Sequence, residues 1–511
     1  MSSNEDKKQD VEEQPLKDVK VDNVKKRSFI ENIKYVKDNI TVEPIFAGLI
    51  IGATLSRLAV QNLNLDKSCR VKLDFGDEVC DALLEKKGNH TFQEAQVQQI
   101  ISSIESWKSI VQTAIPTLLV IFMGAWSDRT GNRKLCILMP VFGEFLVCIC
   151  NIISTFFFKE ICIEITMFFE AFFSAITGGW VMVYLGVFSY ISDITTPETR
   201  TFRVGMANLC LTAGVPVGTA LSGILLKWLG YYGVFLLSAL IYLSTFIYGC
   251  IYLKKKTKPG VDENEKTNPV SYKDIVVFIK DTAEVAFKPR NGNLRMKIIL
   301  TLSVVAIIYG PNHGERILTY MFVRYRLHWD AISYSIYSTF SVVIHSIGAF
   351  FSITVFSKRW GFHDSMLCLI SVTSKLVGSI YIAFVYTDLQ MFLVPLVEIL
   401  NATTFTSLRS MASKLVEGDE MGKMNSLFSL VETLAALMFD PTYSLLYART
   451  VSTFTATVYL FSAFMTLPAI STLIWFFVQH RRETKDRTAI IEKQEQKEKE
   501  AAATESANTH L

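Results

Sequence analysis

The sequence predicts an all-α membrane protein with twelve transmembrane helices arranged as two six-helix bundles. Three observations support this prediction. The 511 residues are 50% apolar and include 36 Phe, and their mean hydropathy is positive. Apolar runs of about 20 residues, the length that crosses a bilayer as a helix, recur along the chain. Basic residues gather between alternate runs, as they do on the cytoplasmic side of membrane proteins.

Twelve apolar runs are long enough to be membrane spans, and the seventh of them is rich in polar groups. Because residues 1–41 form a charged tail and not a cleavable signal sequence, we expect the first span to act as the insertion signal. The predicted spans are 42–62, 106–126, 134–157, 161–191, 203–227, 231–253, 297–323, 333–356, 364–386, 389–413, 423–447 and 451–478.

The positions of Lys and Arg predict the orientation of these spans. With twelve spans, every basic cluster falls on one side of the membrane, so the N- and C-termini are expected in the cytoplasm. The predicted organisation is a cytoplasmic tail, a first bundle, a cytoplasmic linker, a second bundle and a second cytoplasmic tail, at 1–41, 42–253, 254–296, 297–480 and 481–511. We expect both tails to be disordered, because they are rich in Lys, Glu and Gln.

The loop 63–105 would then face the outside of the cell or a lumen. It contains Asn89, followed by His90 and Thr91, which is an acceptor pattern for N-glycosylation. Cys69 and Cys80 share this loop, whereas the other seven of the nine cysteines lie in or beside apolar spans. We therefore predict a disulfide bond between Cys69 and Cys80.

Several classes of function are excluded by what the sequence lacks. The net charge of +3 is too small to indicate nucleic-acid binding. No metal-ligand spacing, catalytic nucleophile motif or nucleotide-binding loop is present, so we predict neither an enzyme nor a bound metal or cofactor. Any active transport would have to be driven by a gradient.

The link between the second and third spans carries the most informative motif, which reads GAWSDRTG from Gly124 and continues with basic residues. Gly124 lets a neighbouring helix approach, Asp128 can meet the partly positive start of a facing helix, and Gly131 permits a tight turn. Arg129 and Arg133 hold the link in the cytosol. An ordinary basic loop would explain the arginines but not the glycines and the aspartate in register. The motif resembles the signature of the major facilitator superfamily, which implies a gating role for these residues.

A faint internal repeat supports two related bundles. The sequence SKRWG at 357–361 is similar to SDRTG at 127–131, with the acid replaced by a lysine, and Lys414 stands where Asp193 does in the first half. We hypothesise that Asp128 and Asp193 engage basic or helix-terminal partners at a cytoplasmic gate in the outward-facing state. The alternative is that they are loop residues without a gating role, and this alternative is stronger for Asp193. Two further basic residues complete the predicted gating set, Arg200 and Arg203.

A narrower resemblance covers roughly 42–478. The chain resembles solute carrier family forty-six, the proton-coupled folate transporter group, in the motifs that start at Val42, Cys69, Tyr190, Gly314 and Arg409. The resemblance implies gradient-driven movement of organic anions such as folates, or of conjugated, muropeptide-like or nucleotide-like solutes, at the cell surface or the lysosome.

This chain also departs from the family's pattern. The folate-carrying members have a glutamate implicated in proton coupling where Asn208 stands, and they have a cysteine where His328 stands. Folate is therefore one possible substrate among several.

Ionisable side chains inside spans cost on the order of 2.5–3.5 kcal/mol each at the bilayer centre, so they should face a cavity or each other. Burial favours the protonated form of a carboxyl group, which makes three glutamates proton-carrier candidates, and a histidine is the other option. The predicted substrate and proton pathway consists of Glu170, Glu315, Glu398, His345 and Arg409. Other ionisable residues within spans are Glu144, His313, Arg316, Lys375, Glu432 and Asp440.

Two helix faces carry further expectations. Glu398 and Arg409 would share one face of span ten, about 16 Å apart along its axis. Arg409 is expected to anchor an anionic group of the substrate or to lock the inner gate; the alternative is an interfacial charge that reaches the headgroups. Glu170 would head a polar stripe on span four as an unpaired acid, and this stripe is either a helix contact or a cavity wall.

The sequence thus favours a secondary active transporter of organic anions, coupled to protons and working by alternating access. Its partners would be a small organic anion, protons and the lipid bilayer. The alternatives are a lysosomal exporter of muropeptide-like or nucleotide-like solutes, and a receptor or scaffold that binds a solute without moving it. The expected location is the plasma membrane, with the lysosomal membrane as the alternative.

Overall fold

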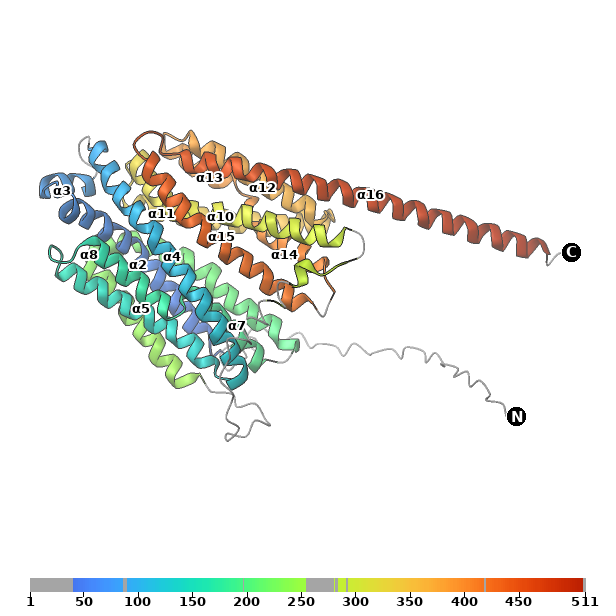
Figure 1. Ribbon diagram of the computed structural model, residues 1–511, viewed down its shortest axis with the longest axis horizontal. Helices are drawn as coiled ribbons and strands as arrows, with labels where there is room; N and C mark the ends of the chain where they lie inside the picture. Colours follow the sequence, from blue (N-terminus) through green and yellow to red (C-terminus); the bar gives the residue numbers. More distant parts are fainter. Residues whose placement is uncertain are drawn as a thin grey trace, which may run out of the picture. The chain divides into compact units, whose positions relative to one another are not determined.

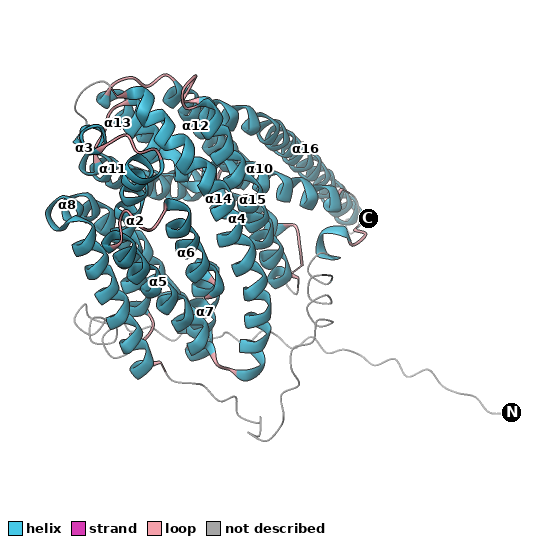
Figure 2. Ribbon diagram, turned by 60° about the vertical axis from the view of Figure 1, so that its left-hand side comes forward, coloured by secondary structure: helices cyan, strands magenta, loops and turns pink. Residues whose placement is uncertain are grey.

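The computed structural model describes residues 40–85, 90–195, 197–253, 280, 284–290, 293–417 and 420–508. The helices described below all belong to the unit Val42–Leu511. Every regular element in these ranges is a helix (Figure 2). Asn89 lies outside the described residues, as do most of the N-terminal tail and most of the linker.

The first half of the fold runs from α2 to α8. Its helices are α2 (Glu43–Lys67), the π-helical η1 (Ser68–Lys72), α3 (Asp77–Glu85), α4 (Thr91–Thr130), α5 (Arg133–Phe156), α6 (Ile163–Ile176), α7 (Gly179–Ile194) and α8 (Pro197–Tyr252). Helices α2 and α5 both pack against α8. The approach of α2 to α8 is close, because a Cβ added at Gly52 would overlap the ring of Tyr242.

The second half runs from α10 to α16. Its helices are α10 (Leu294–Arg326), α11 (Ala331–Phe351), the π-helical η2 (Ser352–Arg359), α12 (Asp364–Ala383), α13 (Asp388–Val397), the 3₁₀ turn η3 (Asn401–Thr403), α14 (Thr404–Lys414), α15 (Met421–Thr450) and α16 (Thr457–Asn508). The two halves meet where α4 packs against α15 and α8 packs against α11 (Figure 1).

Nine of the described helices are long and apolar enough to cross a membrane, or ten if the bent pair α13 and α14 forms one span. Helix α8 contains two of the twelve predicted spans, because it continues across a non-helical break at Gly230. Helix α15, whose Glu432 and Asp440 lower its hydropathy, is not among the nine. The total of twelve spans stays a prediction.

Two predicted spans are broken helices. Span four divides into α6 and α7 at Gly178, whose φ of 90° is left-handed. Span ten divides into α13 and α14, which are bent by 41° across the break. The expectation that Glu398 and Arg409 share one helix face was therefore wrong, since a continuous helix is needed to keep residues eleven positions apart in phase.

The C-terminal segment also differs from expectation. We expected residues 481–511 to be disordered, but α16 continues as a helix to Asn508 and projects past the other helices (Figure 1). Its sequence is rich in Ala, Glu, Lys and Gln, which have high helix propensity. Low hydrophobicity alone therefore did not predict disorder here.

Among the described residues, the buried apolar cluster that joins the two halves lies at one end of the fold. The cluster nearest the Cys69–Cys80 pair contains residues of both halves, for example Leu58 and Ile101 with Leu318 and Tyr447. The two other large clusters contain residues of a single half each. We call the first region the disulfide end and the opposite region, around the link between α4 and α5, the Gly131 end.

Candidate functional site

The Gly131 end contains most of the predicted gating residues. Gly131 follows α4 with a φ of 67°, and its N–H donates to the carbonyl of Ser127. This is the left-handed turn that only glycine adopts without strain. A Cβ added at Gly124 would lie 3.5 Å from Leu185, which is an ordinary contact. The side chains of Asp128 and Arg129, in the last turn of α4, lie outside the described part of the structure.

Two ion pairs fix the helix ends around this turn. The Arg133 Nε lies 2.9 Å from an Asp193 carboxylate oxygen, and its Nη1 donates to Ser127 Oγ at 3.1 Å. Arg203 donates to both carboxylate oxygens of Glu43, at 2.6 and 3.1 Å. Asp193 therefore has a basic partner, but this partner belongs to the same half, and the role of the pair in a gate stays a prediction. The side chain of Arg200, the remaining gating candidate, is not among those described.

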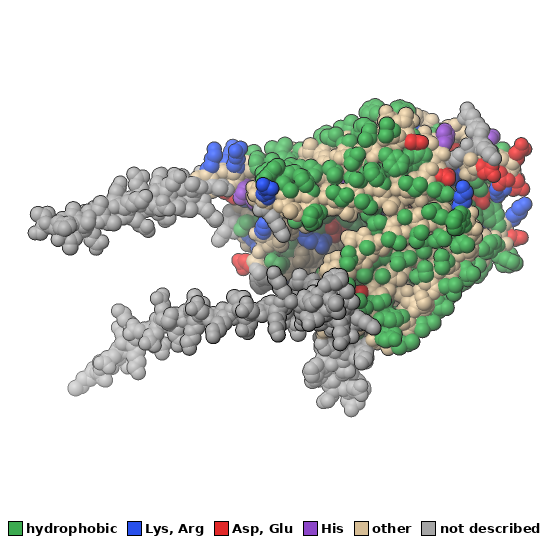
Figure 3. Space-filling view, turned by 180° about the vertical axis from the view of Figure 1, so that it is seen from behind, with side chains coloured by type: hydrophobic (Ala, Val, Ile, Leu, Met, Phe, Trp, Pro, Cys, Tyr) green, Lys and Arg blue, Asp and Glu red, His purple; other side chains and the backbone are tan. Residues whose placement is uncertain are grey.

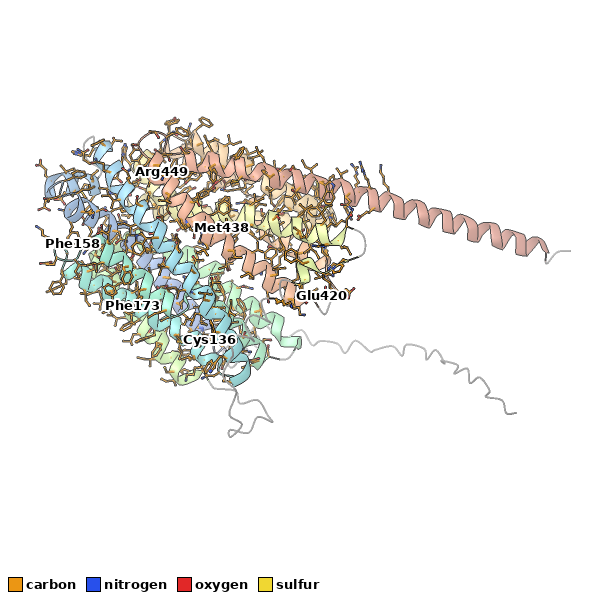
Figure 4. The ribbon with its side chains drawn as sticks, in the orientation of Figure 1. Cys136, Phe158, Phe173, Glu420, Met438 and Arg449 are labelled. Atoms are coloured by element: carbon orange, nitrogen blue, oxygen red, sulfur yellow. A yellow bond between two sulfur atoms is a disulfide. The ribbon has the colours of Figure 1, made fainter. Side chains whose placement is uncertain are left out.

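The second half repeats both pairs with the charges exchanged. Asp364 begins α12 as Arg133 begins α5, and it accepts from Lys414, the counterpart of Asp193, at 2.6 Å. Arg290 precedes α10 as Glu43 begins α2, and it donates to Glu420 just before α15. Figure 4 labels Glu420 at this end of α15 and Arg449 at the opposite end.

Glu420 is held as a carboxylate by its neighbours. Hydrogen bonds from Arg290 and then Lys288 lower the pKa of its carboxyl group. A lowered pKa in the folded state stabilises the fold above the unfolded-state pKa, and this stabilisation is lost as the pH falls through the folded-state value. The contact therefore strengthens this end at neutral pH.

The centre of the second half contains a buried charge cluster. The Lys375 Nζ lies 2.6 Å from a Glu315 carboxylate oxygen and 3.0 Å from a Glu398 carboxylate oxygen. Three helices supply these residues, because Lys375 is on α12, Glu315 is on α10 and Glu398 caps the end of α13. Glu315 and Glu398 were both predicted for the pathway, and the structure brings them together. Lys375 was recognised only as an ionisable span residue.

The first half contains a similar cluster. Lys108 on α4 lies 2.9 Å from a Glu170 carboxylate oxygen and 3.4 Å from one of Glu105. The expectation that Glu170 is an unpaired acid was therefore wrong, because a sequence shows the face of a helix but not the side chain that it meets. The second oxygen of Glu170 is buried without a hydrogen-bond partner. The break at Gly178 also interrupts the stripe that Glu170 was expected to head.

Among the described residues, the two remaining pathway candidates form no hydrogen bond or ion pair with these clusters, although His345 lies within electrostatic range of Lys375. His345 on α11 is partly buried, with Nδ1 3.4 Å from Ser341 Oγ and with a buried Nε2 that has no hydrogen-bond partner. Arg409 on α14 donates to Glu432 on α15 at 3.1 Å and lies over the ring of Phe428. Half of the Arg409 side chain is exposed. Arg409 and Glu398 therefore have different partners.

The disulfide end is closed by contacts between the halves. Arg324 of α10 donates to Glu94 of α4 at 2.8 Å, and Tyr320 of α10 donates to Asn62 of α2 at 2.8 Å. Tyr447 of α15 donates to Gln98 of α4 at 2.7 Å. All six side chains are buried, although the sequence singled out none of them. Figure 3 shows a recess between the two halves in which acidic and basic side chains are visible.

The predicted disulfide bond is present. Cys69 and Cys80 are bonded, with their Cα atoms 5.9 Å apart. Between them in sequence, Arg70 forms ion pairs with Asp66, Asp77 and Asp81. The bond and the Arg70 cluster together fasten η1 to α3.

Comparison with protein families and curated proteins gives consistent matches. A model described as Major Facilitator Superfamily matches residues 49–440. The probable peptidoglycan muropeptide transporter SLC46 of Drosophila melanogaster is 22% identical over 431 residues, which cover 83% of each chain. The lysosomal proton-coupled steroid conjugate and bile acid symporter SLC46A3 of Gallus gallus is 26% identical over 366 residues, covering 71% of this chain and 77% of the relative.

Solved structures share the fold at low sequence identity. A POT family transporter in complex with 5-aminolevulinic acid superimposes with a TM-score of 0.56 at 14% identity, covering 85% of this chain and 95% of the other. The human organic anion transporter MFSD10 (TETRAN) gives a TM-score of 0.50 at 14% identity, covering 83% of this chain and 98% of the other. These similar proteins are transporters and not enzymes.

Proposed function

Because the chain belongs to the major facilitator superfamily, and is thus a multi-pass membrane transporter of a solute, we propose that it moves organic anions together with protons by alternating access. Its resemblance to solute carrier family forty-six agrees with this class of substrate. The proposal names the proton as the coupling ion, an anion as the solute, and the residues that bind the proton and the solute.

The observation that carries the proposal is the cluster of Glu315, Lys375 and Glu398. Two carboxylates share one ammonium group, which leaves one negative charge in excess among buried side chains. An uncompensated charge away from water is unfavourable, so binding of one proton to either carboxylate would stabilise the cluster. A proton entering from an acidic compartment would release Lys375 from one acid and change how α10, α12 and α13 are held together.

A second proton-binding cluster in the first half would act in the same way. Glu105 and Glu170 share Lys108, so this cluster also carries one negative charge in excess. The two clusters lie in different halves, and each is built across helices of its own half. His345 is a further proton-acceptor candidate, because its buried Nε2 has no partner.

Alternating access would proceed by relative movement of the halves. Opening of the disulfide end requires the Arg324–Glu94, Tyr320–Asn62 and Tyr447–Gln98 contacts to break. In the opposite state we assign closure of the Gly131 end to Asp128, Arg129, Arg133 and Asp193 in the first half. Arg200, Arg203 and Arg409 belong to the same proposed gate.

The names of two relatives support a proposal for the location and the chemical range of the solute. One relative is named as a lysosomal proton-coupled symporter of steroid conjugates and bile acids. Another is named as a probable muropeptide transporter. We therefore propose a conjugated organic anion and an acidic lumen, with the lysosomal membrane and the plasma membrane as the two locations to compare.

The test is uptake by proteoliposomes at two pH values on the outside. We expect uptake of anionic solutes, but not of matched neutral ones, to rise as the pH falls on the side that supplies protons. Glu315→Gln and Glu398→Gln should abolish this acceleration while Glu78→Gln, an exposed acid on α3, should keep it. Uptake that does not depend on pH would contradict proton coupling, and saturable binding without uptake would identify a receptor.

A further inference from the structure

Two arginines in the interior of the helical unit lack the partners that the other interior arginines have. Arg57 on α2 and Arg316 on α10 are both exposed, and among the described residues neither has a hydrogen bond or an ion pair. By contrast, Arg324 is paired with Glu94 and Arg203 with Glu43. The fold therefore supplies carboxylates to Arg324 and Arg203 but not to this pair.

Arg57 and Arg316 lie near each other on helices of opposite halves. Arg316 lies within electrostatic range of Arg57, and Tyr334 on α11 lies within range of both. Helix α10 packs against α4, α14, α15 and α16, so an exposed side chain that also interacts with α2 must lie between the halves. The exposure of both arginines is thus access to the space between the halves.

This arrangement is unfavourable without a ligand. A cation within the span region of a bilayer is costly unless it is paired or solvated, and two like charges at close range repel each other. An anion placed between them would satisfy both guanidinium groups. Guanidinium groups present planar donors that match carboxylate, sulfate and phosphate oxygens.

Aromatic side chains lie beside the arginine pair. Tyr184 on α7 and Tyr309 on α10 are within electrostatic range of Arg316. Trp180 and Tyr184, on one face of α7, are 37% and 36% exposed, and their ring centroids are 6.2 Å apart. Flat ring surfaces that remain accessible next to an anion site fit a solute whose charged group is attached to a ring.

We propose that Arg57 and Arg316 together bind the anionic group of the transported solute, with Tyr184, Trp180 and Tyr309 against a flat ring system. This inference rests on the proposed function and specifies its substrate site. The ligand is an organic anion with a carboxylate, sulfate or phosphate on a planar body.

The site also explains how the solute drives the conformational change. When the halves close around an empty site, the two guanidinium groups approach each other and their repulsion opposes closure. A bound anion removes this repulsion and bridges α2 to α10. Only the loaded protein then passes easily between its two states, which prevents leakage of the proton gradient.

The test measures binding by the purified full-length protein. The probes are 2-naphthyl sulfate and 2-naphthoate, with neutral 2-naphthol and inorganic sulfate for comparison. We expect the two aryl anions to bind saturably and more tightly than 2-naphthol or sulfate. Arg57→Gln and Arg316→Gln should each weaken this binding about tenfold or more, since each removes charge-assisted hydrogen bonds. The Lys variants at both positions should lose less.

Arg449→Gln is the matched control, because Arg449 is an exposed arginine at the disulfide end of α15 (Figure 4). Binding by both Gln variants that equals wild type would overturn the assignment. Failure of the wild type to bind either aryl anion would overturn it as well, and so would equal affinity for inorganic sulfate, since the site would then select no organic body. Uptake assays with the same variants separate this inference from the proposed function. Anion uptake that persists in both Gln variants would contradict only the arginine site. Arginine-dependent binding without uptake would contradict only the proposed transport function.

Discussion

At the residue scale, the chemistry of the second half depends on one ammonium group shared by two acids. Lys375 contacts both Glu315 and Glu398 within 3.0 Å. Neither acid has to be unpaired for the cluster to bind a proton, because the shared lysine already leaves one negative charge in excess. This differs from a simple buried salt bridge, in which opposite charges cancel.

Removal of the shared lysine should therefore destabilise the protein strongly. Lys375→Met leaves two carboxylates next to each other, and breaking a buried ion pair from one side costs about 3–5 kcal/mol. We expect a lower thermal unfolding temperature in detergent. Adding Glu398→Gln to Lys375→Met should recover part of the loss, since one buried charge is removed. A double variant less stable than the single variant would contradict this account.

Arg409 shows how a contact seen in the structure changes an expectation. If Arg409 anchored an anionic group of the solute through a bidentate contact, as the sequence suggested, Arg409→Lys would raise KM. In the structure Arg409 makes one hydrogen bond to Glu432 and is half exposed. A lysine can make a single contact of this kind. We now expect uptake by Arg409→Lys to stay within about twofold of wild type, and uptake by Arg409→Gln to fall. Equal losses of uptake in Arg409→Lys and Arg409→Gln would instead support a bidentate contact of Arg409 with the solute.

At the element scale, ion pairs join the helices at the Gly131 end, and the acidic and basic positions are exchanged between the two halves. Arg133 and Asp193 join α5 to α7, and Asp364 and Lys414 join α12 to α14 in the reverse sense. The backbone therefore accommodates either arrangement at equivalent positions.

Reversal of the first pair should be tolerated only when both residues change. Arg133→Asp and Asp193→Arg each place two like charges at the contact, and uptake should fall in both. The double variant restores opposite charges in the order used by the second half, so it should regain most of the uptake. Uptake at matched membrane expression is the measurement. A double variant as impaired as the singles would mean that the contact does not matter for transport.

The sequence predicted contacts that stay within a short segment better than contacts between helices. Cys69 and Cys80 could be paired because they share a loop. A basic partner for Asp193 was expected, but the sequence did not show that it is Arg133. The pairing of Glu170 with Lys108 was missed for the same reason. Arg57 was missed because an arginine without a partner can be recognised only after the partners of the others are known.

At the scale of the whole molecule, the two halves are joined by buried polar contacts at the disulfide end and carry separate apolar clusters towards the Gly131 end. This asymmetry describes one state of a two-state transporter. Its stability relative to the other state depends on the Arg324–Glu94 pair, which is buried on both sides.

Weakening that pair should shift the balance between the states. Glu94→Gln exchanges a charge-assisted hydrogen bond for a neutral one, a change worth on the order of 1 kcal/mol or more. A cysteine introduced at Trp180 should then react faster with a reagent that enters from the disulfide end, because the population of the minor state rises by the full change in the equilibrium constant. The expected change is roughly five- to tenfold, since each 1.4 kcal/mol corresponds to a factor of ten. Glu78→Gln is the control, and an unchanged rate in Glu94→Gln would show that this pair does not hold the state.

The sign-exchanged pairs also limit the routes by which a duplicated chain reaches this arrangement. If the halves descend from one duplicated ancestor, both copies began with the same sign at each position. A single replacement would have set two like charges against each other, so an inherited pair could invert only by way of a neutral residue at one position. With a neutral residue in one half, the helix ends of that half would have lost their ion pair. The protein could still fold because the other half kept its pair. On that descent the duplication came before the inversion, and the two halves are no longer interchangeable at these positions.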